Sequence, residues 1–298
     1  MNMTNEELLN LFTTNANKRP FQLSDGTIAQ YMKQIGYFLS YVDNKNLLEI
    51  TRKDVKQYMM SLEISDSYYN VALASIRKLY SVFAYLLDDE NVVDVTFGLV
   101  PIKNIKSEHK IPLSELEQEL MLKYCKNKRD YAIVLTLLNT GLRINELVCL
   151  TLDDYSNRDE NGKIHLTITK GSKEADVYFN NKVCKAIDEY LIIRKESEYN
   201  NLFISDGRKP MDRSCCSRTL KTIARRAGFS DDRVAKISNH VTRKSFGSNL
   251  ANNGVDMQTI ATAMRHSNIQ TTFNSYVKMD ENKIKQPSSY SKLPLSFK

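Results

Sequence analysis

Tryptophan is absent from this sequence of 298 residues, and histidine and cysteine are scarce, with four and five residues. The cysteines form no Cys-x-x-Cys pair, whereas a structural zinc site needs paired Cys or His ligands at short spacing. We therefore expect no metal and no other cofactor. The cysteines should be reduced thiols in a reducing compartment; they are Cys125, Cys149, Cys184, Cys215 and Cys216.

Long apolar runs are also missing. The longest candidate, Tyr131–Leu138, is interrupted by Thr136 and is too short to span a bilayer. The first residues, Met1–Glu7, have neither the basic start nor the apolar stretch of a signal peptide. These absences argue against an integral membrane protein and against a secreted one. They predict a cytoplasmic protein without a membrane partner.

The charge of the chain is uneven. The formal net charge is +7, with 42 basic and 35 acidic residues. Up to Lys110 the chain has 12 basic and 13 acidic residues, or −1, and the remainder has 30 and 22, or +8. A basic second half fits a polyanionic partner such as nucleic acid, and it also fits an ordinary solvated surface.

The first 100 residues have the apolar spacing of helices and no strand alternation. Helices are predicted over 27–42, over 53–62 and over 68–87. Thr51 is the expected N-cap of the second, with Asp54 in the place of the capping-box glutamate. Residues 1–100 should form a small helical domain. Periodicity is lost between Asp94 and Lys110, so we expect a linker over 101–112, which either follows a phosphate backbone or is a solvated connection.

Helical spacing resumes in the second half, the expected domain 113–298. Ser114 and Glu117 form a capping box, and Gly141 should end an apolar helix over 130–139. Strict alternation over 163–169 and 175–179 predicts a β-hairpin with Lys170 at its tip. Further predicted elements are helices over 143–152, 182–195, 213–227, 240–252, 256–265 and 271–277, and a short strand over 202–204. The predicted fold class is mainly α (α+β), a helical domain followed by a mixed domain with a small antiparallel sheet.

The second half also carries an ordered set of residues that can bind or attack a phosphate. These residues are Arg143, Lys170, His240, Arg243, His266 and Tyr276. His240 and Arg243 are three residues apart and so share a helix face. Glu146 lies one turn beyond Arg143, where it either orients a neighbouring side chain or is a surface carboxylate.

The order and spacing of these residues resemble the motifs of the tyrosine recombinase, or phage integrase, family. The similar segments are 140–147 for the first arginine, 169–173 for the lysine, 240–246 for His-x-x-Arg, 264–272 for the last histidine and 274–276 for the nucleophile. The resemblance is close from about Lys110 onward and looser before it. One position departs from the family pattern, because Arg265 stands where the family usually has glycine.

The resemblance implies DNA strand exchange through a covalent 3′-phosphotyrosine at Tyr276. Arg143 and Arg243 then bind the non-bridging phosphate oxygens, which suits a planar, always charged guanidinium. Lys170 is the implied acid for the departing 5′-oxygen. His240 exchanges a proton near Tyr276, and His266 donates to the phosphate.

Duplex DNA is the implied partner, bound by a homotetramer on paired sites, with an accessory or partner recombinase as an option. The resemblance makes residues 1–100 a core-binding (SAM-like) DNA-binding domain and 113–298 the catalytic domain. The helix over 213–227 either faces DNA or is a solvated face. Candidate DNA contacts are Arg52, Lys53, Lys56, Arg77, Lys78, Lys103, Lys106, Arg218, Lys221 and Arg225.

Two other functions remain open at this stage. A type IB topoisomerase-like enzyme uses similar chemistry but relaxes DNA without joining partners. A DNA-binding regulator without catalysis is suggested by Thr222–Gly228, which faintly resembles part of a helix-turn-helix. The resemblance favours a simple Xer-like architecture, although mobile-element integrases of this size exist too. Integration, excision and dimer resolution all remain compatible with the sequence.

Overall fold

The computed structural model describes residues 3–87, 94–103, 110–166, 174–266, 268 and 270. The chain divides into two compact units, Met1–Glu108 and His109–Lys298. Each unit has its own hydrophobic core. The predicted roles of the two units, DNA binding for the first and catalysis for the second, are not decided by this division.

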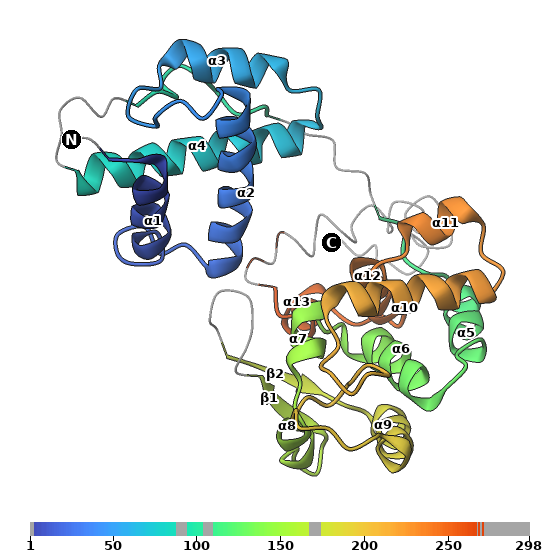
Figure 1. Cartoon of the computed structure of the whole chain (residues 1–298). Coiled ribbons are helices and arrows are strands. Elements are labelled where there is room, and N and C mark those ends of the chain that lie inside the picture. Colours follow the sequence, from blue (N-terminus) through green and yellow to red (C-terminus); the bar gives the residue numbers. More distant parts are fainter. Residues whose placement is uncertain are drawn as a thin grey trace, which may run out of the picture. The chain divides into compact units, whose positions relative to one another are not determined.

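The described part of the first unit is helical (Figure 1). Its helices are α1 (Asn5–Asn15), α2 (Asp25–Tyr41), α3 (Arg52–Ser61) and α4 (Asp66–Leu86). Helix α4 packs against the other three, and Phe12, Phe38 and Phe83 are fully buried between them. Thr51 and Asp54 form the predicted capping box of α3. The three predicted helices begin one or two residues earlier than their apolar spacing indicated, because their caps precede the first apolar position.

Residues 94–103 pack against the first unit, and Val95 is part of its core. Arg77 donates from Nη2 to the carbonyl of Leu99 (2.8 Å) and from Nε to Thr96 Oγ1 (3.1 Å). Arg52 donates from Nη2 to the carbonyl of Phe97 (2.9 Å), and its guanidinium lies 5.0 Å from the centre of the Phe97 ring. Residues 94–103, the first part of the segment 94–110 that lacks helical periodicity, therefore belong to the first unit.

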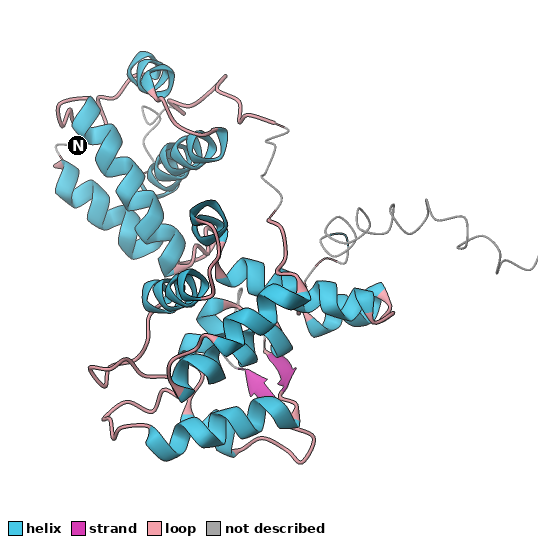
Figure 2. Cartoon of the chain, turned by 90° about the vertical axis from the view of Figure 1, so that its right-hand side faces the viewer, coloured by secondary structure: helices cyan, strands magenta, loops and turns pink. Residues whose placement is uncertain are grey.

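The second unit is mixed, with many helices and one small sheet (Figure 2). Its elements are α5 (Glu115–Lys123), α6 (Lys128–Thr140), α7 (Ile144–Cys149), α8 (Leu152–Ser156), β1 (Lys163–Leu166), β2 (Ala175–Tyr178), α9 (Asn181–Ile193), α10 (Arg213–Arg226), α11 (Asp231–Lys236), α12 (Asn239–Asn252) and α13 (Met257–Ala263).

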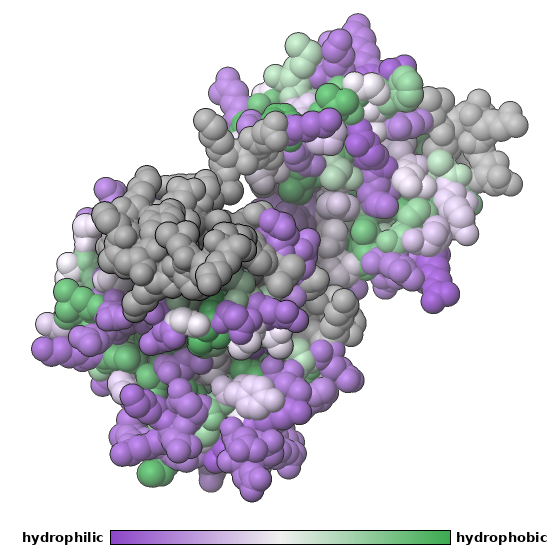
Figure 3. Space-filling view, turned by 180° about the vertical axis from the view of Figure 1, so that it is seen from behind, coloured by the Kyte–Doolittle hydropathy of each residue, from purple (hydrophilic) through white to green (hydrophobic). Residues whose placement is uncertain are grey.

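Helix α6 is the centre of this unit. Every residue from Ala132 to Leu138 is buried, so this stretch is covered on all sides, as expected of a helix enclosed by others. It contacts α5, α9 and α12. The polar residues of the unit lie mainly outside this core, and hydrophilic side chains cover most of the visible described surface in Figure 3.

The predicted hairpin is present as the antiparallel pair β1 and β2. Ile164 pairs with Val177, and both side chains are buried. The hairpin tip, with Lys170, lies outside the described residues. The predicted fold class is confirmed by this combination of helices with one small antiparallel sheet.

Two predictions of local structure were wrong in the middle of the second unit. The helix expected over 143–152 is two short helices, α7 and α8, because Leu150 is extended and Thr151 caps α8. Leu202–Ile204 form no strand; only isolated bridges occur there, Thr151 with Asn201 and Ile204 with Pro210. These apolar residues are buried. A short apolar run indicates that residues are buried, but it does not show that they pair as strands of a sheet.

The helix predicted over 256–265 ends early, at Ala263. Arg265 has a φ of 53°, which no α-helix accommodates. Helices α1 and α11 were not predicted, and the six residues of α11 carry too little periodicity to indicate a helix. Among the described residues, no helix is long and apolar enough to cross a membrane.

Candidate functional site

A sharp turn at Gly141 positions the first arginine. Helix α6 ends at Thr140, and Gly141 adopts φ 57°, as predicted for a helix C-cap. A Cβ at this position would lie 2.4 Å from a carbon of the Phe246 ring on α12. Only glycine fits both the backbone angle and the space, so the chain turns here directly into Arg143 at the start of α7.

Arg143 is held by its own helix and by a distant segment. Its backbone N–H donates to Glu146 Oε2 (2.8 Å), and its Nη1 donates to Glu146 Oε1 (2.7 Å). Its Nη2 donates to the backbone carbonyl of Arg265 (2.7 Å). The side chain remains 27% exposed, so its orientation is fixed while it stays accessible.

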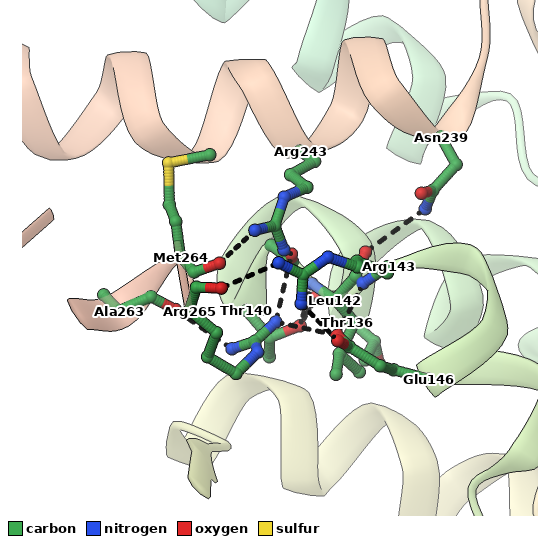
Figure 4. Close-up of polar contacts among 11 residues, drawn as sticks. Thr136, Thr140, Leu142, Arg143, Glu146, Asn239, Arg243, Ala263, Met264 and Arg265 are labelled. Atoms are coloured by element: carbon green, nitrogen blue, oxygen red, sulfur yellow. Dashed lines mark hydrogen bonds and ion pairs between the residues drawn. The ribbon is translucent and has the colours of Figure 1, made fainter. Parts of the chain in front are cut away.

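Arg243 approaches the same place from α12 (Figure 4). Its Nη1 donates to the carbonyl of Gly141, and its Nη2 donates to the carbonyl of Met264. The residue is only 5% exposed. Arg143 and Arg243 therefore bind the consecutive carbonyls of Arg265 and Met264, which brings three sequence motifs together in one cluster.

Arg265 adds a third guanidinium to this cluster. Its Nη2 lies 3.0 Å from Glu146 Oε2 and also donates to the carbonyl of Gly141 (3.2 Å). Its Nη1 donates to the carbonyl of Ala263 (3.0 Å). The position usually held by glycine in the family thus keeps the left-handed backbone that glycine favours, with a buried arginine on it.

Glu146 is the counter-charge at the centre of the arginines. Its side chain is 1% exposed, so the alternative of a surface carboxylate is wrong. Burial opposes its ionisation, but the charges of Arg265 and Arg143 outweigh it, and the pKa of the Glu146 carboxyl lies below its usual value. An ionised Glu146 holds two arginines in place.

The two histidines differ in environment. His266 is half-buried beside the cluster, and burial together with Arg243, Arg143 and Arg265 lowers its pKa from 6.5 to about 4. His266 is therefore neutral near pH 7, when it can both donate and accept a hydrogen bond. His240 lies exposed in the first turn of α12. Lys170 and Tyr276 lie outside the described residues, and so does the helix predicted over 271–277.

Comparison with known proteins identifies the family of the chain. The profile of the phage integrase family matches residues 111–283, more than half of the chain. The chain belongs to the phage integrase family. The resemblance to tyrosine recombinases, enzymes that cut and rejoin DNA strands, is thereby confirmed.

Curated relatives of this recombinase match over most of their length. The tyrosine recombinase XerC of Pediococcus pentosaceus is 26% identical over 270 residues, which are 84% of this chain and 87% of that protein. The tyrosine recombinase XerD of Rickettsia bellii is 28% identical over 288 residues, covering 89% and 92%.

A solved structure extends the likeness to the fold of the recombinase. The crystal structure of the XerH site-specific recombinase, bound to palindromic difH substrate in a post-cleavage complex, matches with a TM-score of 0.70. The match covers 96% of this chain and 84% of that chain at 18% identity, and it shows a shared fold.

The candidate DNA contacts of the recombinase have varied surroundings. Lys53 and Lys56 are exposed on α3, and Arg218 and Arg225 are exposed on α10 with Lys221 half-buried between them. Arg52 and Arg77 bind residues 96–99, and the Lys78 ammonium lies 5.6 Å from the centre of the Phe21 ring. Lys106 lies outside the described residues, and Lys103 is exposed. Contact with DNA stays a prediction for all ten.

Proposed function

We propose that this chain is a site-specific recombinase that cuts and rejoins duplex DNA through a 3′-phosphotyrosine at Tyr276. One observation carries the proposal: Arg143 and Arg243 converge on the carbonyls of Arg265 and Met264, directly before His266. Tyr276 follows ten residues later in the sequence. Two guanidiniums and a neutral imidazole in one cluster form a set of donors for the oxygens of one phosphodiester.

Each step of the reaction has a residue suited to it. The Tyr276 oxygen attacks phosphorus, its proton passes to His240, and the bond from phosphorus to the 5′-oxygen breaks. Lys170 gives that oxygen a proton, while Arg143, Arg243 and His266 stabilise the charge on the non-bridging oxygens. The new ester conserves the bond type, so the 5′-hydroxyl of a second strand reverses the step without an energy source.

Duplex DNA is the proposed substrate. The charge of +8 after Lys110 favours a phosphate backbone, and the similar XerH has been seen on DNA after cleavage. A tetramer on paired sites follows from strand exchange, because two duplexes are each cut on both strands. A partner recombinase and a cytoplasmic location belong to the same proposal.

The test uses a duplex selected from a random library by binding to the full chain. A nick close to the cleavage position lets the cut end diffuse away, so a covalent intermediate accumulates. With EDTA present, the wild type should form a protein–DNA adduct on a denaturing gel, and Tyr276→Phe should bind the duplex without forming one. An unchanged adduct with Tyr276→Phe would overturn the proposed nucleophile.

Arg143→Ala is the matched test of the phosphate site. Glu146 keeps Arg265 as a partner in this variant, so the fold should survive. Adduct formation should fall by about 10²-fold or more, because a donor to the developing charge is lost. DNA binding without any adduct, in the wild type as well, would favour a non-catalytic regulator. Relaxation of supercoiled DNA without exchange of strands would favour the topoisomerase-like alternative.

A further inference from the structure

Arg265 is an unusual residue for its backbone position. With φ at 53° it occupies the left-handed region, which disfavours side chains with a Cβ. Its side chain is only 7% exposed, and burying a guanidinium is unfavourable unless a counter-charge compensates. Something in this fold must therefore favour arginine here over the glycine that the backbone angle suits.

The ion pair with Glu146 supplies that compensation. Arg265 Nη2 lies 3.0 Å from Glu146 Oε2, and the carboxylate is nearly inaccessible at 1% exposure. The Nε of Arg265 is buried without a hydrogen-bond partner among the described residues. The guanidinium is thus oriented toward the carboxylate rather than placed to satisfy all of its own donors.

Charge counting shows what this pair changes. Glu146 also binds Arg143 at 2.7 Å. Without Arg265, the formal charges of Arg143, Arg243 and Glu146 would therefore add up to +1. With Arg265 the sum over three arginines and one carboxylate is +2. A DNA phosphodiester carries −1, and its attraction to the site grows with that sum.

We propose that Arg265 is a positioning residue that supplies the counter-charge of Glu146 and thereby leaves the positive charge of Arg143 and Arg243 to the DNA phosphate. This inference rests on the proposed function of the site. The backbone carbonyl of Arg265 also accepts a hydrogen bond from Arg143 Nη2. Arg265 therefore orients Arg143 in two ways, directly through this carbonyl and indirectly through Glu146. It does not itself touch the reacting atoms.

A double-variant cycle tests the proposal with Arg265→Gly, Glu146→Gln and the two combined. Arg265→Gly relieves the backbone angle, so it should fold. On the selected nicked duplex it should slow adduct formation about tenfold, since one charge near the phosphate is lost. The double variant has two arginines and no carboxylate, a sum of +2 as in the wild type, so its rate should recover to within about threefold of wild type. A loss of rate that follows the unfolding midpoint through the cycle would instead indicate a purely structural role, and it would overturn the proposal.

Arg233→Gln is the control for loss of a partly buried ion pair. Arg233 binds Glu117 through Nε (2.7 Å) and Nη2 (2.8 Å), outside the arginine cluster of the same unit. Its unfolding midpoint should fall while the rate of adduct formation stays within about twofold of wild type. A tenfold loss of rate in this control would mean that the rate reports stability, and it would count against the proposal.

Binding of inorganic phosphate separates the proposal from the proposed function. We would measure the rise in unfolding temperature that phosphate causes, against chloride at equal ionic strength, for all four proteins of the cycle. Arg265→Gly should weaken phosphate binding about tenfold, with recovery in the double variant. If the wild type forms no adduct, the proposed function fails while this cycle still decides the role of Arg265. Equal phosphate binding by wild type and Arg265→Gly, or no recovery in the double variant, would overturn it.

Discussion

Arg143 donates from Nη2 to the backbone carbonyl of Arg265 at 2.7 Å, across 122 positions of sequence. The bond connects the start of α7 with the turn after α13. Arg243 connects α12 with the neighbouring carbonyl of Met264 and with Gly141. The arginines of the cluster are therefore fixed by main-chain acceptors before any DNA is bound, which is the arrangement that electrostatic catalysis requires.

Gly141→Ala should destabilise the second unit. The added Cβ would lie 2.4 Å from the Phe246 ring, and the alanine backbone would have to keep a φ of 57°. We therefore expect a loss of about 2–4 kcal/mol in the free energy of unfolding. Gly228→Ala is the matched control, because its φ is 80° and no atom lies within 4 Å of the added Cβ. It should lose only about 1 kcal/mol in the same urea titration. Equal losses would show that the Phe246 contact is relieved at little cost.

The pH dependence of stability should show the lowered pKa of His266. Its pKa is about 4 in the folded protein and near 6.5 in the unfolded chain, so between these values only the unfolded chain takes up the proton. The free energy of unfolding should therefore fall as the pH falls through this window and level off below about 4. Urea titrations across the window should show a shallower fall for His266→Gln.

His165→Gln is the control with the opposite sign. The exposed His165 has a raised pKa, because Asp176 accepts a hydrogen bond from its ring at 3.0 Å. Its small contribution is present below about 6.5 and is lost as the pH rises. The deficit of this variant should grow toward low pH, whereas that of His266→Gln should shrink. The same trend in both variants would contradict the assignment.

Arg77→Gln should loosen residues 96–99. The variant loses the bonds to Thr96 and Leu99, so amide hydrogen exchange in this stretch should become faster by about fivefold or more. Lys53→Gln is the control, since Lys53 is exposed on α3, and it should leave exchange there unchanged. If both variants weaken DNA binding but only Arg77→Gln changes exchange, Lys53 acts through the DNA alone. Unchanged exchange in Arg77→Gln would show that its two bonds do not hold the segment.

Features governed by local chemistry could be predicted from the sequence. The capping boxes Thr51–Asp54 and Ser114–Glu117, the left-handed turn at Gly141 and the hairpin of β1 and β2 depend on residues a few positions apart. The resemblance to the family motifs identified the arginines and histidines of the site in the correct order. Their convergence in one cluster could then be expected, although not its contacts.

Features governed by distant partners could not be predicted. Nothing near Glu146 in the sequence shows that Arg265 covers it, and so its burial was left open. The packing of Arg243 against Gly141 and Met264 likewise depends on three separate segments. One usable signal was present: an arginine in a position that the family reserves for glycine indicates a special backbone and a reason to tolerate it.

The most direct test of the account is to identify the residue that carries the DNA. The adduct formed by wild type on the nicked duplex is trimmed with nuclease and digested with trypsin, and the modified peptide is sequenced by mass spectrometry. Cleavage after Arg265 and Lys278 yields the peptide 266–278, in which Tyr276 is the one tyrosine. We expect a nucleotide attached through a 3′-phosphate to this tyrosine. A nucleotide on any other residue would contradict this expectation.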